Sequence, residues 1–214
     1  MFSRHDLAWL TPAGWEAALA RAPASAHAAL QQWHDRDWPA VVRRQEPGVP
    51  DDVVCLGIPL PEVDGVRQRL ALVADTGRIE RRQAPMPLAD ALGAAPPAWL
   101  AALVALQRAG ALFDLRVYGS LAMASLTGLA YLRPASDIDL LLRPASACEL
   151  AAGVALLQEY AALLPLDGEI VFPSGEAVAW KEWLAAQRAG ARVLAKSMQS
   201  VRLADAAQLA ATLA

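Results

Sequence analysis

The chain carries two short stretches that decide its fold, Val117-Tyr118-Gly119-Ser120 and, further on, Ser136-Asp137-Ile138-Asp139-Leu140-Leu141-Leu142. The first is typical of a strand that ends in a small-residue turn and opens a helix. The second is typical of an apolar strand that carries two carboxylates. Because side chains two residues apart point to the same face of a strand, Asp137 and Asp139 are expected to project together, with Ile138 buried on the other face.

This pairing indicates phosphate chemistry. Neighbouring carboxylates repel each other and tolerate closeness best when a divalent cation lies between them. The Gly119-Ser120 turn offers backbone N–H groups to a phosphate, and a residue without a Cβ lets the backbone come close. A phosphate cradle beside metal-holding carboxylates is typical of nucleotidyl transfer. The plainer interpretation is an exposed polar strand whose carboxylates pair with Arg133 or Arg143.

A third carboxylate would complete a two-metal site, and Leu166-Asp167-Gly168-Glu169-Ile170 offers two candidates. Glu169 leads into an apolar strand and is the first choice. Asp167 would share its face unless Gly168 breaks the alternation. A plain turn at Asp167-Gly168 is the alternative to both.

The bulk composition describes a well-packed protein without a basic surface. The 214 residues suffice for one large domain or two small ones, 56% are hydrophobic, and the net charge of −3 argues against a tRNA or poly(A) polymerase or another nucleic-acid binder. The two cysteines, Cys55 and Cys148, form no metal-binding or redox motif and are expected to be reduced and buried. With neither a signal peptide nor a membrane-length apolar run, a cytoplasmic protein with no membrane partner is expected.

The pattern along the chain predicts an α+β fold with a linker at residues 83–87. Residues 1–84 are expected to form a mixed α/β domain with a small antiparallel sheet. Its helices are predicted at 12–20, capped by Thr11, and at 24–33, starting near Ser25, and its strands at 40–44, 53–60, 67–73 and 78–82.

Residues 85–214 are expected to form a nucleotidyltransferase-like catalytic domain, a mixed sheet flanked by helices. Strands are predicted at 115–118, 137–142 and 170–172, and helices at 97–109, 120–126, 146–163, 177–189 and 201–213. Ser146 with Glu149 forms a capping box. Trp180 and Trp183 are expected in the core, although one of them could instead stack on an adenine.

The order Gly119-Ser120, Asp137-Ile138-Asp139 and a later single carboxylate resembles the nucleotidyltransferase superfamily related to DNA polymerase beta. Further stretches of the sequence narrow the resemblance to one family within this superfamily. They include Arg4-His5-Asp6-Leu7, Asp37-Trp38-Pro39, Leu126-Thr127-Gly128, Tyr131-Leu132-Arg133-Pro134-Ala135-Ser136 and Asp167-Gly168-Glu169. Together these stretches resemble the malonate decarboxylase holo-acyl-carrier-protein synthases, the phosphoribosyl-dephospho-CoA transferases.

The resemblance implies a concrete reaction. Such enzymes attach a phosphoribosyl-dephospho-CoA group to a serine of the acyl carrier subunit of malonate decarboxylase. The donor is 2′-(5″-triphosphoribosyl)-3′-dephospho-CoA, and pyrophosphate leaves. By the same resemblance, Mg²⁺ is held by Asp137 and Asp139, and Glu169 or Asp167 helps to hold a second metal and favours loss of the serine proton. The resemblance also implies that Gly119 and Ser120 bind the triphosphate.

The leaving pyrophosphate needs cations beyond Mg²⁺. The candidates for binding it are Arg43, Arg44, Arg133 and Lys181. Each is otherwise an ordinary solvated charge.

Two other function classes fit parts of the pattern. A transferase of the same superfamily that modifies another protein or a small molecule, such as an aminoglycoside, would share the metal site and differ in its acceptor. A non-catalytic nucleotide-binding or antitoxin-like module would keep only a vestigial site. The intact Gly-Ser turn and both aspartates of the pair count against the second class.

Overall fold

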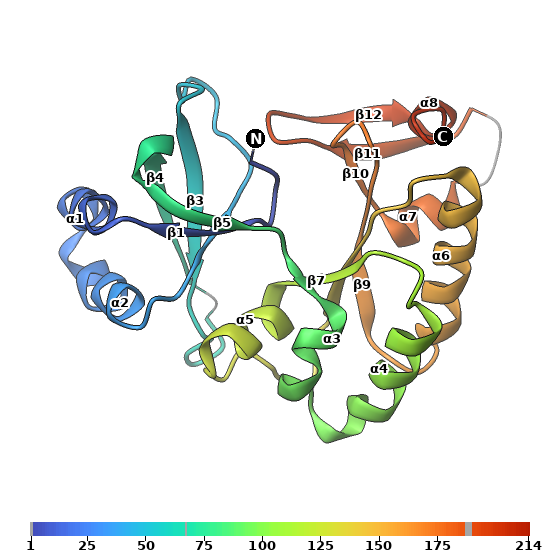
Figure 1. The fold of residues 1–214 in the computed structure, drawn as a ribbon, viewed down its shortest axis with the longest axis horizontal. Helices are drawn as coiled ribbons and strands as arrows, with labels where there is room; N and C mark the ends of the chain where they lie inside the picture. Colours follow the sequence, from blue (N-terminus) through green and yellow to red (C-terminus); the bar gives the residue numbers. More distant parts are fainter. Residues whose placement is uncertain (1, 67, 187–189) are drawn as a thin grey trace. The chain divides into compact units, whose positions relative to one another are not determined.

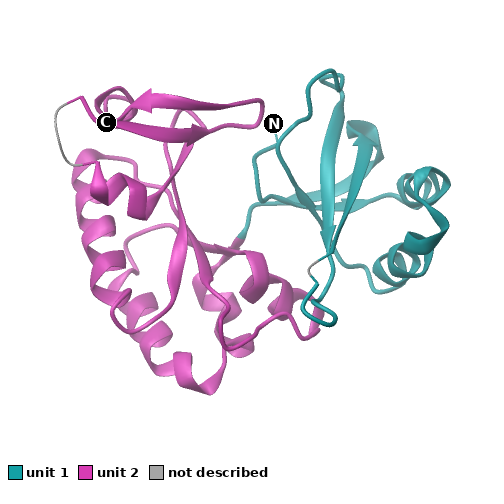
Figure 2. Cartoon of the chain, turned by 180° about the vertical axis from the view of Figure 1, so that it is seen from behind, with its two compact units in different colours: residues 1–85 teal, residues 86–214 magenta. Residues whose placement is uncertain are grey.

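The computed structural model describes residues 2–66, 68–186 and 190–214 of the chain. The chain divides into two compact units, one up to Pro85 and one from Met86 to Ala214 (Figure 2). The division falls within the stretch predicted as a linker, one residue beyond the predicted boundary at residue 84. Each unit has its own sheet, and both sheets together make the predicted α+β fold.

The first unit is an antiparallel sheet with two helices (Figure 1). Its strand order is β4-β3-β2-β1-β5. The strands are β1 (Leu7–Leu10), β2 (Ala40–Val42), β3 (Val53–Pro59), β4 (Arg69–Asp75) and β5 (Ile79–Gln83), and the helices are α1 (Pro12–Arg21) and α2 (Ala24–Asp35). The predicted antiparallel sheet is confirmed. The first residue of the strand predicted at 67–73 lies outside the described residues.

One central strand of this sheet, β1, was not predicted. It lies between β2 and β5, and all four of its residues are buried. A strand buried on both faces has a continuous apolar sequence, so it lacks the alternation that identifies a half-exposed strand.

The second unit is built on a seven-stranded sheet in the order β12-β11-β10-β9-β8-β7-β6. β8 and β9 pair in parallel and the other neighbours are antiparallel, which confirms a mixed sheet. The strands are β6 (Met86–Pro87), β7 (Leu115–Tyr118), β8 (Ile138–Leu142), β9 (Leu166–Val171), β10 (Ala177–Ala179), β11 (Arg192–Lys196) and β12 (Val201–Asp205). The helices are α3 (Leu88–Ala91), α4 (Pro97–Ala109), α5 (Gly119–Thr127), α6 (Ala147–Tyr160), α7 (Trp180–Ala185) and α8 (Ala206–Ala210).

The two faces of this sheet differ in character. One face contributes to the hydrophobic core beside residues of α4 and α6, and α4 and α6 contact each other. Residues of this core include Leu140 and Ile170 from the sheet, Leu103 from α4 and Leu157 from α6. The strand pairing puts Asp139, Asp167 and Glu169 on the other face, which we call the carboxylate face.

Two predicted helices are wrong in part. The first residues of each are a strand: residues 177–179 form β10, and residues 201–205 form β12, which pairs with the unpredicted β11. The two predicted helices as a whole are rich in Ala, which favours helix, but sheet pairing overrides this weak local preference in their first residues. The end of the helix predicted at 177–189 lies outside the described residues.

Helix starts follow the cap chemistry of the sequence at α1 and α6 but not at α2. Thr11 accepts a hydrogen bond from the Gly14 amide, and Ser146 accepts one from the Glu149 amide. Helix α2 begins at Ala24, next to Ser25 as predicted, but it has no side-chain cap.

Buried thiols were predicted for both cysteines. Cys55 is buried, but Cys148 is exposed in the first turn of α6. Trp180 and Trp183 lie in the core as expected, and the ring of Trp183 lies 5.1 Å from that of Phe172. Among the described helices, none has the length and apolar character needed to cross a membrane.

Candidate active site

The turn from β7 into α5 is built around Gly119. Its φ of +67° lies in the left-handed region, which favours glycine. A Cβ at this position would overlap the Oδ2 atom of Asp139. The absent side chain therefore leaves room for the Asp139 carboxylate beside the first residue of the helix, where backbone N–H groups are not used inside the helix.

Asp139 lies at the centre of the site because β8 lies between β7 and β9. It is paired with Tyr118 on one side and with Asp167 on the other. Residues paired across adjacent strands point to the same face and lie about 4.8 Å apart. The predicted partner of Asp139 in the pair, Asp137, is exposed and directly precedes β8.

Strand β9 runs without interruption through Asp167, Gly168 and Glu169, so the plain-turn alternative is wrong. Gly168 pairs with Leu140 and has a φ of +131°, and a Cβ there would overlap the backbone of Leu140. The register continues on both sides of it. Asp167 and Glu169 therefore share the carboxylate face.

The two candidate third carboxylates have different surroundings. Asp167 is half-buried, and its Oδ1 lies 3.7 Å from Nζ of Lys181. Glu169 is only 4% exposed, and its Oε1 accepts a hydrogen bond of 2.9 Å from Nζ of Lys196. Accessibility and the direct pairing with Asp139 favour Asp167 as the third carboxylate, against the first choice from sequence.

The loop between α5 and β8 ends at Asp137 and is held by hydrogen bonds of its own. Ser136 is buried, its Oγ accepts a hydrogen bond from the Arg133 amide, and its own amide donates to the Arg133 carbonyl. Tyr131, also buried, shares a side-chain hydrogen bond with Thr127. Burial raises the pKa of Tyr131 well above its usual range, although this hydrogen bond opposes the shift.

The oxygen ligands at this site suit Mg²⁺ in chemical type. Among residues 2–66, 68–186 and 190–214, no group of three or more His, Cys, Asp or Glu side chains is gathered tightly enough to hold a metal ion. Mg²⁺ usually keeps several waters and is held by one or two carboxylates together with substrate phosphates. Asp139 and Asp167 fit that arrangement, in which the substrate supplies the remaining ligands.

The predicted cations divide between the two units. Lys181 is exposed beside Asp167, and Arg133 is exposed four residues before Asp137. Arg43 and Arg44 follow β2 in the first unit. Arg44 is exposed, whereas the Arg43 guanidinium donates to Glu46 at 2.6 Å and to the Leu56 carbonyl at 3.0 Å. A phosphate-binding role for these four residues stays a prediction.

Lys196 is one of the charged residues of the carboxylate face that the sequence pattern did not identify as site residues. It ends β11, and that strand was not predicted. Val193 and Ala195 are buried, whereas Leu194 between them is exposed. Because Leu194 is apolar as well, the sequence lacks the apolar/polar alternation that identifies a half-buried strand.

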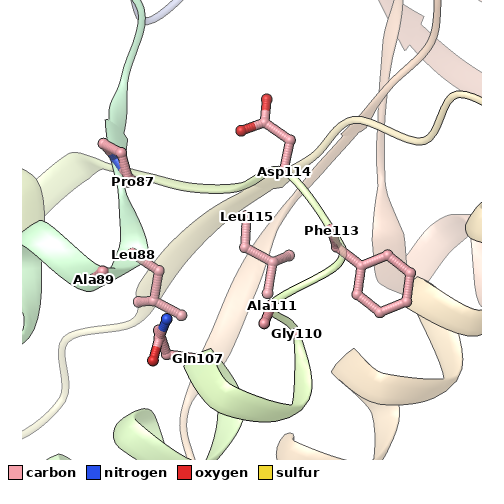
Figure 3. A pocket seen from close by; sticks show the side chains of 9 residues that line it. All are labelled: Pro87, Leu88, Ala89, Gln107, Gly110, Ala111, Phe113, Asp114 and Leu115. Atoms are coloured by element: carbon pink, nitrogen blue, oxygen red, sulfur yellow. The ribbon is translucent and has the colours of Figure 1, made fainter.

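A shallow hollow of about 130 Å³ lies at the opposite end of β7 from Gly119. Figure 3 shows the Asp114 carboxylate at its rim turned away from Gln107 and Gly110. That carboxylate already accepts two hydrogen bonds, of 2.8 and 3.0 Å, from Nε of Arg116. The hollow contains none of the predicted site residues, so the chemistry is assigned to the carboxylate face.

Comparison with known proteins identifies the family to which this geometry belongs. Residues 3–85 match the family model described as the phosphoribosyl-dephospho-CoA transferase MdcG N-terminal domain, and residues 87–207 match the one for its C-terminal domain. The chain belongs to the phosphoribosyl-dephospho-CoA transferase family. It is therefore a transferase.

Curated relatives of this transferase cover most of the chain. A phosphoribosyl-dephospho-CoA transferase of Xanthomonas euvesicatoria is 39% identical over 215 residues, covering 98% of this chain and 97% of the relative. One from Bradyrhizobium diazoefficiens is 37% identical over 211 residues, covering 94% and 89%. One from Xanthomonas campestris is 38% identical over 187 residues, covering 86% of each. No solved structure gives a significant match.

Proposed function

We propose that this transferase moves the phosphoribosyl-dephospho-CoA group of 2′-(5″-triphosphoribosyl)-3′-dephospho-CoA to a serine of the acyl carrier subunit of malonate decarboxylase. The observation that carries the proposal is the direct pairing of Asp139 with Asp167 beside Gly119. The family and its relatives support the transferred group. The carrier protein and the donor come from the sequence resemblance.

The reaction breaks one phosphoanhydride bond and forms one phosphodiester. The serine oxygen of the carrier attacks the phosphorus attached to the ribose, the bond to the next phosphate breaks, and pyrophosphate leaves with the bonding electrons. The serine proton passes to solvent. Bound Mg²⁺ would neutralise the charge that develops on the phosphate oxygens.

The residues of the chain position the reactants and balance their charge. Asp139 and Asp167 would hold Mg²⁺ from the adjacent strands β8 and β9, and Asp137 adds an exposed carboxylate just before β8. The N-terminus of α5, at Gly119 and Ser120, would bind a phosphate oxygen through backbone N–H groups. In-line phosphoryl transfer depends on this kind of positioning and charge neutralisation.

The test is transfer to the carrier followed by intact-mass spectrometry. The purified enzyme is incubated with Mg²⁺, the triphosphoribosyl donor and the apo carrier subunit. The proposal expects a mass gain of one phosphoribosyl-dephospho-CoA. Asp139→Asn should abolish the mass gain. Asp114 is a surface carboxylate at the far end of β7, and Asp114→Asn should leave the mass gain unchanged.

The other outcomes separate the alternatives. If folded wild-type enzyme leaves the carrier unmodified but transfers a nucleotide to another protein or to a small molecule, the acceptor assignment is wrong and the site assignment stands. If Asp139→Asn modifies the carrier as fast as the wild type, the site is wrong.

A further inference from the structure

The ion pair between Glu169 and Lys196 joins two strands that are not neighbours. Glu169 lies on β9 and Lys196 on β11, with β10 between them. The Lys196 Nζ donates to Glu169 Oε1 at 2.9 Å. Side-chain exposure is 5% for Glu169 and 32% for Lys196, so the carboxylate is buried while the lysine side chain is partly exposed.

Small residues on β10 make this reach possible. Glu169 pairs with Ala179, and Lys196 pairs with Ala177, so only alanine side chains separate the two on the carboxylate face. Two strand spacings amount to about 9.6 Å, which the long side chains of lysine and glutamate together can bridge. The same pairing puts Lys196 on the face that carries Asp139 and Asp167.

Stability alone is a weak explanation for this pair. Removing charges from water costs several kcal/mol for each ion, and well-packed apolar residues often stabilise a protein as well as a buried ion pair does. A lysine ammonium has three N–H donors, and Glu169 accepts one of them. The arrangement fixes a cation in place, on a side chain that is partly exposed.

The carboxylate face needs such a cation. Asp139, Asp167 and Glu169 give it negative charge, and the proposed donor brings a triphosphate to the same face. Lys181 and Arg116 are other cations there, but Lys181 is 54% exposed and lies 3.7 Å from Asp167, and Nε of Arg116 donates to Asp114 at 2.8 Å. A cation that is already oriented binds its ligand at a lower entropic cost than a mobile one.

We propose that Lys196, oriented by Glu169, binds the pyrophosphate portion of the donor and of the departing product. This inference rests on the proposed function. It makes Lys196 a substrate-binding residue and Glu169 a positioning residue rather than a metal ligand. The donor also contains a second diphosphate, in its dephospho-CoA part, and the proposal assigns Lys196 to the leaving group alone.

The test is calorimetric binding of pyrophosphate in the presence of Mg²⁺, with dephospho-CoA titrated separately. Lys196→Met should weaken pyrophosphate binding about tenfold or more, the size expected for a lost charge-assisted hydrogen bond. Lys196→Arg should restore most of the affinity. Dephospho-CoA affinity should not change, and a loss confined to dephospho-CoA would overturn the assignment.

A double variant separates phosphate binding from simple neutralisation of Glu169. Glu169→Gln with Lys196→Met makes a neutral pair and should recover thermal stability relative to Lys196→Met. The proposal requires that pyrophosphate affinity stay low in this double variant. Recovery of affinity together with stability would show that Lys196 only balances the buried carboxylate. A loss of Mn²⁺ binding in the double variant would make Glu169 a metal ligand and would also overturn the assignment.

Arg202 supplies the matched control. Arg202 lies on β12, the neighbour of β11, and its Nε lies 2.7 Å from Oε1 of Glu176. Its partner across the strands is the core residue Ala195. Arg202→Met should lower stability without changing pyrophosphate affinity. If wild-type enzyme modifies the carrier while Lys196→Met binds pyrophosphate normally, this inference fails alone. If the wild type neither transfers nor binds pyrophosphate, the proposed function fails with it.

Discussion

The Asp139 carboxylate occupies the space beside Gly119 that a Cβ on that glycine would need. The glycine thus has two consequences at once. It permits the left-handed turn into α5, and it leaves room for a site carboxylate next to the helix N-terminus. A carboxylate and phosphate-binding amides are brought together by one missing side chain.

Gly119→Ala should therefore abolish transfer rather than only weaken the fold. The left-handed φ alone costs an alanine about 1–2 kcal/mol of unfolding free energy, and the displaced Asp139 carboxylate costs activity in addition. Gly128, at the other end of α5, is the control because its φ is +72° and a Cβ there would meet open space. Gly128→Ala should lose similar stability in urea unfolding and keep its transfer rate. Equal activity of the two variants would contradict the role given to Gly119.

Asp139→Asn and Asp167→Asn should each reduce transfer at least about a hundredfold, because loss of even an outer partner of a metal ligand costs about 10–100-fold. The fold should persist, since both positions remain polar and lie outside the hydrophobic core. Initial rates over a Mg²⁺ titration measure the effect, with Asp114→Asn as the reference. A near-normal rate for Asp167→Asn would return the third-carboxylate role to Glu169.

Chelation should remove activity without unfolding the protein. Because the described residues hold no preformed cage of three metal-binding side chains, the metal is expected to bind chiefly together with the donor phosphates. Treatment with EDTA should stop transfer, added Mg²⁺ should restore it, and the melting temperature of the donor-free enzyme should not move. A large drop in that melting temperature would indicate a structural metal instead.

The pKa of Tyr131, raised by burial, predicts how stability changes in alkali. Above the ordinary tyrosine pKa of about 10, the unfolded chain loses the phenol proton while the folded protein keeps it. Deprotonation then favours the unfolded state, so the contribution of Tyr131 is complete below that pH and is lost as the pH rises.

Urea unfolding of wild-type enzyme and Tyr131→Phe at pH 8 and at about pH 10.5 measures this contribution. The free energy of unfolding should fall more between the two pH values in the wild type than in the variant. An equal fall in the free energy of unfolding in the wild type and in the variant would show that the Tyr131 phenol ionises as readily in the folded protein as in the unfolded chain.

The sequence by itself determined the local parts of this protein. The α+β class and the start of α5, within one residue of the predicted Ser120, follow from periodicity and from turn and cap residues, which act over a few positions. The Asp137–Asp139 spacing likewise indicated phosphate chemistry. The same local signals explain why α4, from Pro97 to Ala109, agrees with its predicted bounds.

Only the tertiary structure decided which residues meet. The parallel register of β8 with β9 pairs Asp139 with Asp167, and the reach across β10 joins Glu169 to Lys196. Neither fact follows from local pattern, because strand register is fixed by pairing between segments that are distant in the chain. For the same reason, residues 201–205, at the start of a predicted helix, form a strand paired with β11.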